Sequence, residues 1–216
     1  LQGDGLNRSN VLVTGAPYLD SRRVCGDKEI NPLIKRRMKL KDQFVLIALS
    51  GPGHRTSREN YVLTLSWLDQ MIRQNPEVDF VIKLHRKEKL LFYSRFSLMT
   101  MGRVVGKEQA KGLPIDIYEW FKGCSCLITG TSMIAYEAMY SGVPVISVDP
   151  LKQFAGVDFI DQRAARVVYS YDDLTRALHE VNGKPSDAGA FVKTIFAKTD
   201  RSASENIVEQ ISHFLD

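Results

Sequence analysis

Small hydroxyl residues and a carboxylate follow an apolar run near the middle of the chain, in a pattern suited to a phosphorylated ligand. Thr129-Gly130-Thr131-Ser132 closes that run, and Glu137 comes five residues after Ser132. Glycine lets a phosphate approach the backbone, and N–H groups at the start of a helix stabilise negative charge. Glu137 would lie a little over one helical turn along, where a carboxylate can accept hydrogen bonds from ribose hydroxyls. The residues alone favour equally a capped helix with an exposed glutamate.

A glycine-rich turn after the apolar run Phe44–Leu49 is a second candidate for phosphate contact. It contains Gly51, Gly53 and His54 and leads into a helical pattern. Exposed backbone N–H groups in such a turn can meet an anion. The alternative is a tight turn that uses glycine for steric reasons alone.

A third candidate, His85-Arg86-Lys87, follows the apolar run Asp79–Leu84. It carries an imidazole and two cations, which suit an anionic ligand. The alternative is a solvated basic loop in which His85 merely ends a strand.

The elements that would position these residues alternate along the chain. A helical pattern covers Arg58 to Gln74, and a second helix is expected from about Ser132 to Tyr140, with Ser132 as a capping-type residue. Strand, helix and strand in repetition imply right-handed crossovers and a parallel sheet covered on both faces. The expected strands are the short apolar runs Val11–Thr14, Phe44–Leu49, Asp79–Leu84, Ser125–Thr129 and Val145–Val148.

The predicted fold is therefore α/β, a Rossmann-like doubly wound parallel sheet with helices on both faces. In such sheets ligands bind beyond the carboxyl ends of the strands, where all three candidate segments begin. Residues 1–41 are interpreted as an interdomain connector and residues 42–216 as the Rossmann-like domain. The tail is expected to form two or three helices over 172–181 and 188–215.

Composition narrows the classes of function without selecting one. The chain has 216 residues and a net charge of +4, and no stretch approaches the roughly 20 apolar residues of a membrane span. Because the first residues lack the layout of a signal peptide, we expect a cytoplasmic protein. The three cysteines make no disulfide framework, and Cys124 and Cys126 lack further ligands, so no metal site is expected.

The basic run Ile34–Lys41 raises two further possibilities. Nucleic-acid binding is disfavoured because no aromatic residues are interleaved in the run and no known module accompanies it. A solvated connector helix is the favoured interpretation. The alternative is peripheral contact with an anionic membrane, at its inner face, through the cations and the spaced Ile34 and Met38.

Four segments together resemble a known family. The run Cys126–Val148, "CLITGTSMIAYEAMYSGVPVISV", resembles the nucleotide-sugar motif in the C-terminal half of GT-B glycosyltransferases, especially inverting ones such as lipid-A-disaccharide synthase and the peptidoglycan transferase MurG. "VLVTGAPYLD" resembles the segment joining the two GT-B halves, and "RSASENIVEQI" their closing helix. "FVIKLHRKE" resembles the His-Pro motif of polysialyltransferases and of teichoic-acid polymerases with CDP-linked donors, although Arg86 stands in place of the proline.

The resemblance implies roles for the candidate residues. Glu137 would bind the donor ribose, and Gly130, Thr131 and Ser132 its pyrophosphate or phosphate. The remaining phosphate charge would fall to His85 and to the loop of Gly51, Gly53 and His54. Thr129 stands where retaining enzymes of the Glu-x7-Glu type carry their first glutamate, so inversion is expected. The family implies a nucleotide-sugar donor as substrate and no other cofactor.

The implied function is the donor-binding domain of a glycosyltransferase that builds a cell-surface polysaccharide, such as a capsule, or a glycolipid. The catalytic base would come from an N-terminal acceptor half or a partner chain, so the isolated chain is expected to be weakly active or inactive. One alternative is a CDP-glycerol or CDP-ribitol phosphotransferase, and another is a non-catalytic nucleotide-binding or interaction module with the same fold. A hydrolysing UDP-N-acetylglucosamine 2-epimerase is disfavoured, since its paired glycines and consecutive glutamates do not occur at Gly130.

Overall fold

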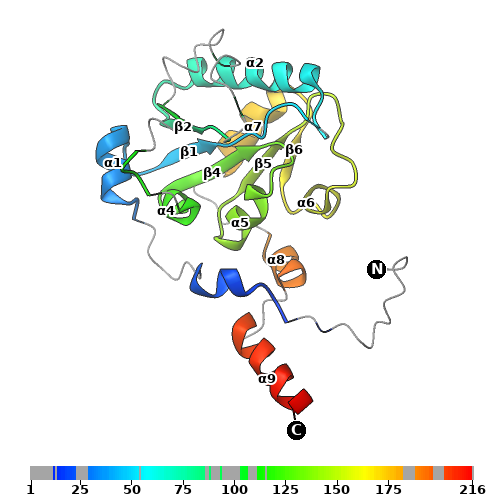
Figure 1. Ribbon diagram of the computed structural model, residues 1–216. Coiled ribbons are helices and arrows are strands. Elements are labelled where there is room, and N and C mark those ends of the chain that lie inside the picture. Colours follow the sequence, from blue (N-terminus) through cyan, green and yellow to red (C-terminus); the bar gives the residue numbers. More distant parts are fainter. Residues whose placement is uncertain are drawn as a thin grey trace. The chain divides into compact units, whose positions relative to one another are not determined.

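In the computed structural model, a six-stranded parallel sheet forms the core of residues 24–189 (Figure 1). The structure describes residues 12, 14–22, 29–53, 55–85, 88, 93, 103–106, 111–114, 116–181, 188–196 and 202–215. The strands lie in the order β3-β2-β1-β4-β5-β6, so the direction of winding reverses between β1 and β4. Their bounds are β1 Phe44–Ile47, β2 Phe80–Lys83, β3 Arg103–Val105, β4 Cys124–Thr129, β5 Val145–Val148 and β6 Arg166–Val168.

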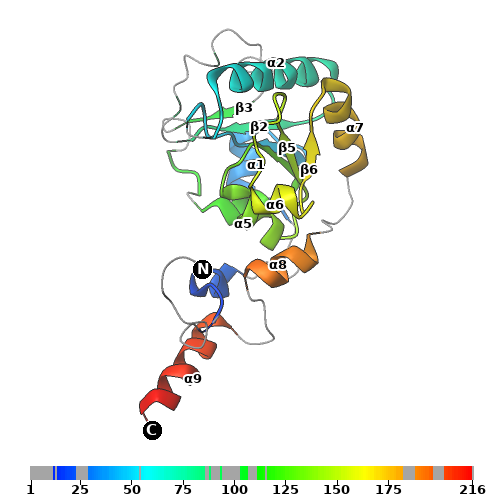
Figure 2. The ribbon, with the colours of Figure 1, turned by 90° about the vertical axis from the view of Figure 1, so that its right-hand side faces the viewer.

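Helices cover both faces of this sheet. In Figures 1 and 2, α2 (Arg58–Gln74) and α7 (Tyr171–Val181) cover one face, and α4 (Ile117–Phe121) and α5 (Ile134–Tyr140) cover the other. The short α6 (Asp158–Asp161) follows β5. This arrangement confirms the predicted α/β class, a doubly wound Rossmann-like sheet.

The helix α2 shows why this part of the chain was readable from sequence. Its predicted bounds are confirmed, and Ser57 caps its first turn by accepting the Asn60 N–H at 3.1 Å. Its apolar stripe is buried against alternate residues of the strands, which form the main core. The buried stripe consists of Tyr61, Leu65, Leu68, Met71 and Ile72.

Other expectations are corrected by the structure. Strands β3 and β6 were not anticipated, because three residues are too few to show a periodic pattern. Helix α5 begins at Ile134, and its N-cap position is Met133, which makes no side-chain capping hydrogen bond. The prediction that Ser132 caps this helix is therefore wrong. The expected strand Val11–Thr14 lies partly outside the described residues, and its described positions, 12 and 14, are not in a strand.

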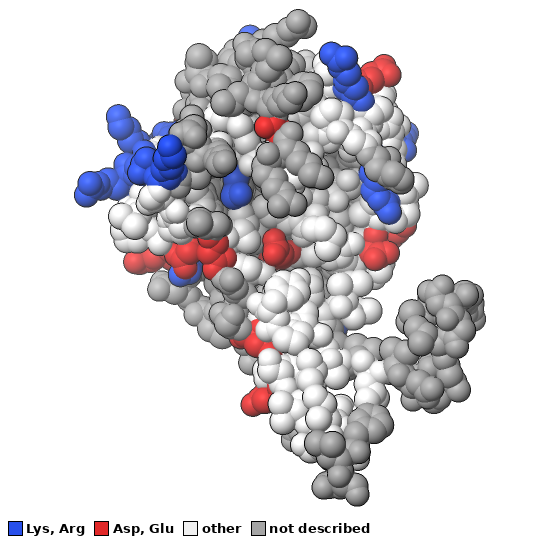
Figure 3. Space-filling view, in the orientation of Figure 1, with Lys and Arg blue, Asp and Glu red and all other residues white. Residues whose placement is uncertain are grey.

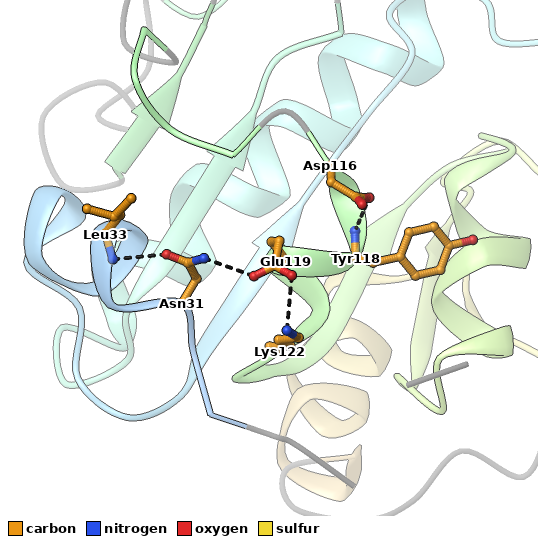
Figure 4. Close-up of polar contacts among 6 residues, drawn as sticks. All are labelled: Asn31, Leu33, Asp116, Tyr118, Glu119 and Lys122. Atoms are coloured by element: carbon orange, nitrogen blue, oxygen red, sulfur yellow. Dashed lines mark hydrogen bonds and ion pairs between the residues drawn. The ribbon is translucent and has the colours of Figure 1, made fainter. Parts of the chain in front are cut away.

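A short helix, α1 (Pro32–Met38), lies beside α4 (Figure 4). Asn31 caps it by accepting the Leu33 N–H at 3.0 Å, and the same side chain donates to Glu119 Oε2 at 2.9 Å. Lys122 Nζ donates to the other Glu119 oxygen at 3.0 Å. These hydrogen bonds, that from Asn31 first, lower the pKa of Glu119. Because Ile34 of α1 is fully buried, α1 is anchored on the domain.

The chain divides into two compact units, residues 24–189 and residues 1–23 with 190–216. The larger unit includes residues 24–41, which the predicted connector also covers; a domain boundary at residue 41 stays a prediction. In the smaller unit, Asp20 caps the helix α9 (Ala203–Leu215) by accepting the N–H groups of Ala203 and Ser204, both at 2.8 Å. The unit also holds η2 (Pro17–Arg22), and α8 (Gly189–Ile195) begins at the division.

Candidate functional site

The carboxyl ends of β1, β4 and β5 are joined by side-chain hydroxyls. Thr129, fully buried at the end of β4, donates through Oγ1 to the Ala48 carbonyl at 2.7 Å. Ser147 of β5 donates to the Gly130 carbonyl at 3.0 Å. A Cβ at Gly130 would lie 3.3 Å from the Phe154 ring, so this ring lies close to the backbone of Gly130. The edge where the strand order reverses is therefore held in a fixed register.

The turn between β1 and α2 has a defined shape. Gly51 has a φ of +73°, which favours glycine, and the peptides of Gly53 and Thr56 pair with each other at 2.9 and 3.3 Å. Gly53 has no heavy atom within 4 Å of where a Cβ would stand. The predicted ligand His54 lies outside the described residues.

Three of the predicted ligand residues meet at one small cavity. It has a volume of about 20 Å³, room for about one water molecule, and lies at the carboxyl edge of the sheet. An open hollow of about 580 Å³ shares Thr56 with it and is lined also by Gly53, Arg55, Ser57 and Gln153. The small cavity is lined by Leu49, Ser50, Gly51, Thr56, Tyr61, Thr64, Gly130, Thr131, Val148 and Phe154.

The start of α2 is tied to the loop that follows β5. The side-chain amide of Gln153 accepts the Ser57 N–H at 2.9 Å and donates to Ser57 Oγ at 3.0 Å. Asn60 Oδ1 accepts the Leu151 N–H at 2.8 Å, whereas its buried Nδ2 has no acceptor among the described residues. Buried Asp149 in turn accepts the Gln153 and Phe154 N–H groups, both at 2.9 Å. Two loops of the candidate site therefore form one hydrogen-bonded body.

Glu137, the predicted ribose ligand, lies partly buried on α5. Its charge acts on Lys83, the last residue of β2: burial lowers the pKa of that ammonium group, and the Glu137 carboxylate opposes the shift. Lys83 was not among the predicted site residues. The polar break that it makes at the end of the apolar run FVIK was the signal that could have indicated it.

His85 follows β2 at the same edge of the sheet. Its N–H donates to Glu88 Oε2 at 2.7 Å, and Glu88 Cγ lies 3.3 Å from where a Cβ on Gly51 would stand. His85 is thereby linked to the β1–α2 turn. Arg86 and Lys87, predicted to add positive charge here, lie outside the described residues.

These residues are arranged in a way that supports ligand binding more clearly than general acid–base catalysis. Backbone turns rich in glycine can receive an anion, Arg55 and Lys83 add positive charge, and Glu137 can accept from hydroxyls. No group of three potential metal ligands occurs in the part of the chain that the structure describes. Within the described helices, none has the length and apolar character that crossing a membrane requires.

Comparisons with known proteins bear on the fold. No family model matches the chain, and no curated protein does. Among solved structures, the chain is similar to a Methanocaldococcus jannaschii UDP-GlcNAc 2-epimerase in complex with UDP-GlcNAc and UDP, with a TM-score of 0.60 and 16% identity over 97% of this chain and 56% of that one. It is also similar to the S. aureus MnaA–UDP co-structure, with a TM-score of 0.63 and 18% identity over 98% and 56%.

A third similar structure is the wall teichoic acid polymerase TagF, in an H444N variant with CDPG. The TM-score is 0.56, with 16% identity over 98% of this chain and 55% of that one. The chain has the fold of a GT-B half. It spans about half the length of each of these proteins. At such identities the similarity establishes the fold, and what the site binds has to be argued from its residues.

Proposed function

We propose that this chain is the donor-binding half of a glycosyltransferase that uses a nucleotide-activated sugar. The observation that carries the proposal is the convergence of Gly51, Gly130 and Thr131 on one cavity, at the edge where the strand order reverses between β1 and β4. Open α/β sheets bind their ligands at such a reversal. Glu137 and His85 lie on segments that leave the same edge.

In this proposal the N–H groups of the two glycine-containing turns receive the donor phosphates. Gly53, with open space around it, allows a close approach of phosphate, and Arg55 lines the adjoining hollow. Ser132 and His54 belong to the same two turns and are proposed as further ligands. Glu137 accepts from the ribose hydroxyls, and its carboxylate attracts the ammonium group of Lys83.

Support comes from the similar structures and from the motif resemblance. The epimerase was solved with UDP-GlcNAc and UDP, and the polymerase with CDPG, so related folds hold nucleotide-linked ligands. The finer proposal, an inverting transferase for a capsule-type polysaccharide or a glycolipid, rests on the motif resemblance. It is supported by Thr129, whose hydroxyl is engaged with Ala48 at the position where Glu-x7-Glu enzymes carry a glutamate. An acceptor half supplies the base in this proposal.

Binding measured by calorimetry tests the proposal directly. We expect the chain to bind one of CMP, CDP, UDP, GDP or ADP, and Glu137→Gln to weaken that binding about 10- to 100-fold, the range for charged hydrogen bonds. The matched 2′-deoxynucleotide should bind more weakly and lose less on that substitution. The control is Glu180→Gln, an exposed glutamate on α7 that pairs with Arg166. Equal losses with ribose and deoxyribose ligands would refute the assignment of Glu137.

The same panel separates the alternatives. A CDP-polyol donor, favoured by the similarity to TagF, predicts selective binding of cytidine nucleotides and turnover of CDP-glycerol with an acceptor half present. A non-catalytic interaction module predicts no binding of any nucleotide in the panel. Robust glycosyl transfer by the isolated chain would contradict the proposal that an acceptor half is required.

We further propose that α1 contacts an anionic membrane, on the cytoplasmic face. Figure 3 shows basic side chains gathered over α1, where Arg36 and Arg37 are exposed beside Leu33, itself 59% exposed. Lys35 belongs to the same surface but pairs with Asp42 at 2.6 Å. Vesicle sedimentation should show binding that requires anionic lipid. Unchanged partitioning after neutralising Arg36 and Arg37 would rule this surface out.

A further inference from the structure

Glu88 binds the backbone of His85 at both of its polar groups. Its carboxylate Oε2 accepts the His85 N–H at 2.7 Å, and its own N–H donates to the His85 carbonyl at 2.8 Å. The two residues are three apart, and His85 comes two residues after the end of β2. The backbone of His85 is thus restrained by a side chain rather than by a strand.

The other carboxylate oxygen of Glu88 is held by two buried tyrosines. Tyr61 and Tyr93 donate to Oε1 at 2.5 and 2.8 Å, and their hydroxyl oxygens lie 2.9 Å apart. The tyrosines are 2% and 1% exposed. Burial, and then the charge of Glu88, raises the pKa of both tyrosines, so both hydroxyls stay protonated and able to donate. Three donors therefore fix the carboxylate in one orientation.

This network connects three elements of the candidate site. Tyr61 belongs to the first turns of α2 and lines the small cavity with Gly51 and Gly130. Glu88 Cγ would lie 3.3 Å from a Cβ at Gly51, whose φ is +73°. A larger residue at Gly51 would strain the turn and press on Glu88. One partly buried carboxylate thus hydrogen-bonds to the start of α2 and to His85, and lies close to the β1–α2 turn.

We propose that Glu88 is a positioning residue that holds His85 toward the donor phosphate, an inference that rests on the proposed nucleotide site. The chain has Arg86 where a His-Pro motif would have proline. Proline restricts the backbone covalently, and here hydrogen bonds to Glu88 supply the restraint instead. Fixing a ligand-contacting group beforehand strengthens binding, because less conformational freedom is lost when the ligand arrives.

The test compares a nucleotide with its nucleoside, using whichever base the chain prefers. Glu88→Gln and Tyr93→Phe should each weaken nucleotide binding about 5- to 20-fold and leave nucleoside binding nearly unchanged, because the bonds they remove position His85 and do not themselves contact the ligand. In a His85→Ala background, Glu88→Gln should have little further effect. The control, Tyr169→Phe, removes the hydroxyl of a tyrosine that is 42% exposed.

Amide hydrogen exchange supplies a second readout that needs no ligand. Exchange at the His85 N–H should be about 10-fold faster in Glu88→Gln, whereas amides in the middle of α2 keep their protection. Equal losses for nucleotide and nucleoside, or full additivity with His85→Ala, would overturn the positioning role. So would unchanged exchange at His85.

The experiment also distinguishes this inference from the function on which it rests. If the wild-type chain binds no nucleotide, the proposed function fails and the positioning role falls with it. If it binds nucleotide and Glu88→Gln binds equally well, the positioning role alone fails. Tyr93→Phe, which keeps the carboxylate, gives a milder variant should Glu88→Gln unfold the chain.

Discussion

The buried tyrosines make the stability of the chain sensitive to alkaline pH. Burial, and then the charge of Glu88, raises the pKa of Tyr61 and Tyr93 above the ordinary tyrosine value. The folded chain therefore keeps two phenolic protons that the unfolded chain releases at a pH of about 10. Tyr93→Phe removes one of these groups and keeps the ring in the core. We expect the variant to show a weaker loss of stability with rising pH.

The direction and size of this effect follow from proton linkage. Below a pH of about 10 both states hold the protons, so the contribution of these groups is complete there. Above it the unfolded state binds fewer protons, and the free energy of unfolding falls by about 1.36 kcal/mol per pH unit for each group. Two tyrosines give a slope of about 2.7 kcal/mol per pH unit, and Tyr93→Phe should reduce that slope by about half.

Urea unfolding at a pH of about 8.5, 9.5, 10.5 and 11 measures the slopes. At the lower values Tyr93→Phe should be less stable than wild type by about 1 kcal/mol, because a hydrogen bond is lost. The difference should shrink as the pH rises. Tyr169→Phe should follow wild type throughout. Parallel curves for wild type and Tyr93→Phe would refute the reasoning.

Three further outcomes are expected. Thr129→Val should lower the free energy of unfolding by about 1–3 kcal/mol, measured in urea, because it leaves the Ala48 carbonyl without its 2.7 Å hydrogen bond. Asp149→Ala should cost about 2–4 kcal/mol in the same assay, since two loop N–H groups lose their acceptor. Cys126 should resist alkylation near neutral pH until the chain is unfolded, because burial raises the pKa of its thiol to about 12.

Each outcome has a result that would contradict it. A Thr129→Val variant as stable as wild type would mean that the carbonyl of Ala48 finds another donor. Wild-type stability of Asp149→Ala would mean that the loop after β5 relaxes at no cost. Labelling of Cys126 in the folded chain, followed by mass spectrometry of the modified peptide, would show that its side chain is reached without unfolding.

Much of the fold could be predicted because its signals are local. The stripe of α2 repeats over 17 residues and ends at Asn75-Pro76, and four of the strands are apolar runs bounded by turn residues. The start of α5 could not be placed, because Ser132 has the residue type of a cap without acting as one. Strands of three residues carry no periodicity, so the formation of β3 and β6 depends on pairing with strands distant in the sequence.

The position of the candidate site could be predicted from the sequence. The hydrogen bonds that hold the site together could not. Glycines and hydroxyl residues directly after strands indicated where a ligand would lie, because parallel strands end at a common edge. The contacts that hold this edge join residues far apart in the chain: Tyr61 meets Glu88 across 27 positions, and Ser57 meets Gln153 across 96. No local pattern encodes such pairs.

The hydrogen bonds between the start of α2 and the loop after β5 limit which segments can be exchanged with related proteins. Loops at this edge are natural places to graft a new specificity, and residues 149–154 form one such loop. Gln153 and Leu151 are bound there by Ser57 and Asn60. A chimera that imports a foreign loop without also importing the residues of α2 that bind it would leave these polar groups without hydrogen-bond partners. The transplantable piece of this protein is therefore a discontinuous one, the loop together with the first turn of the helix.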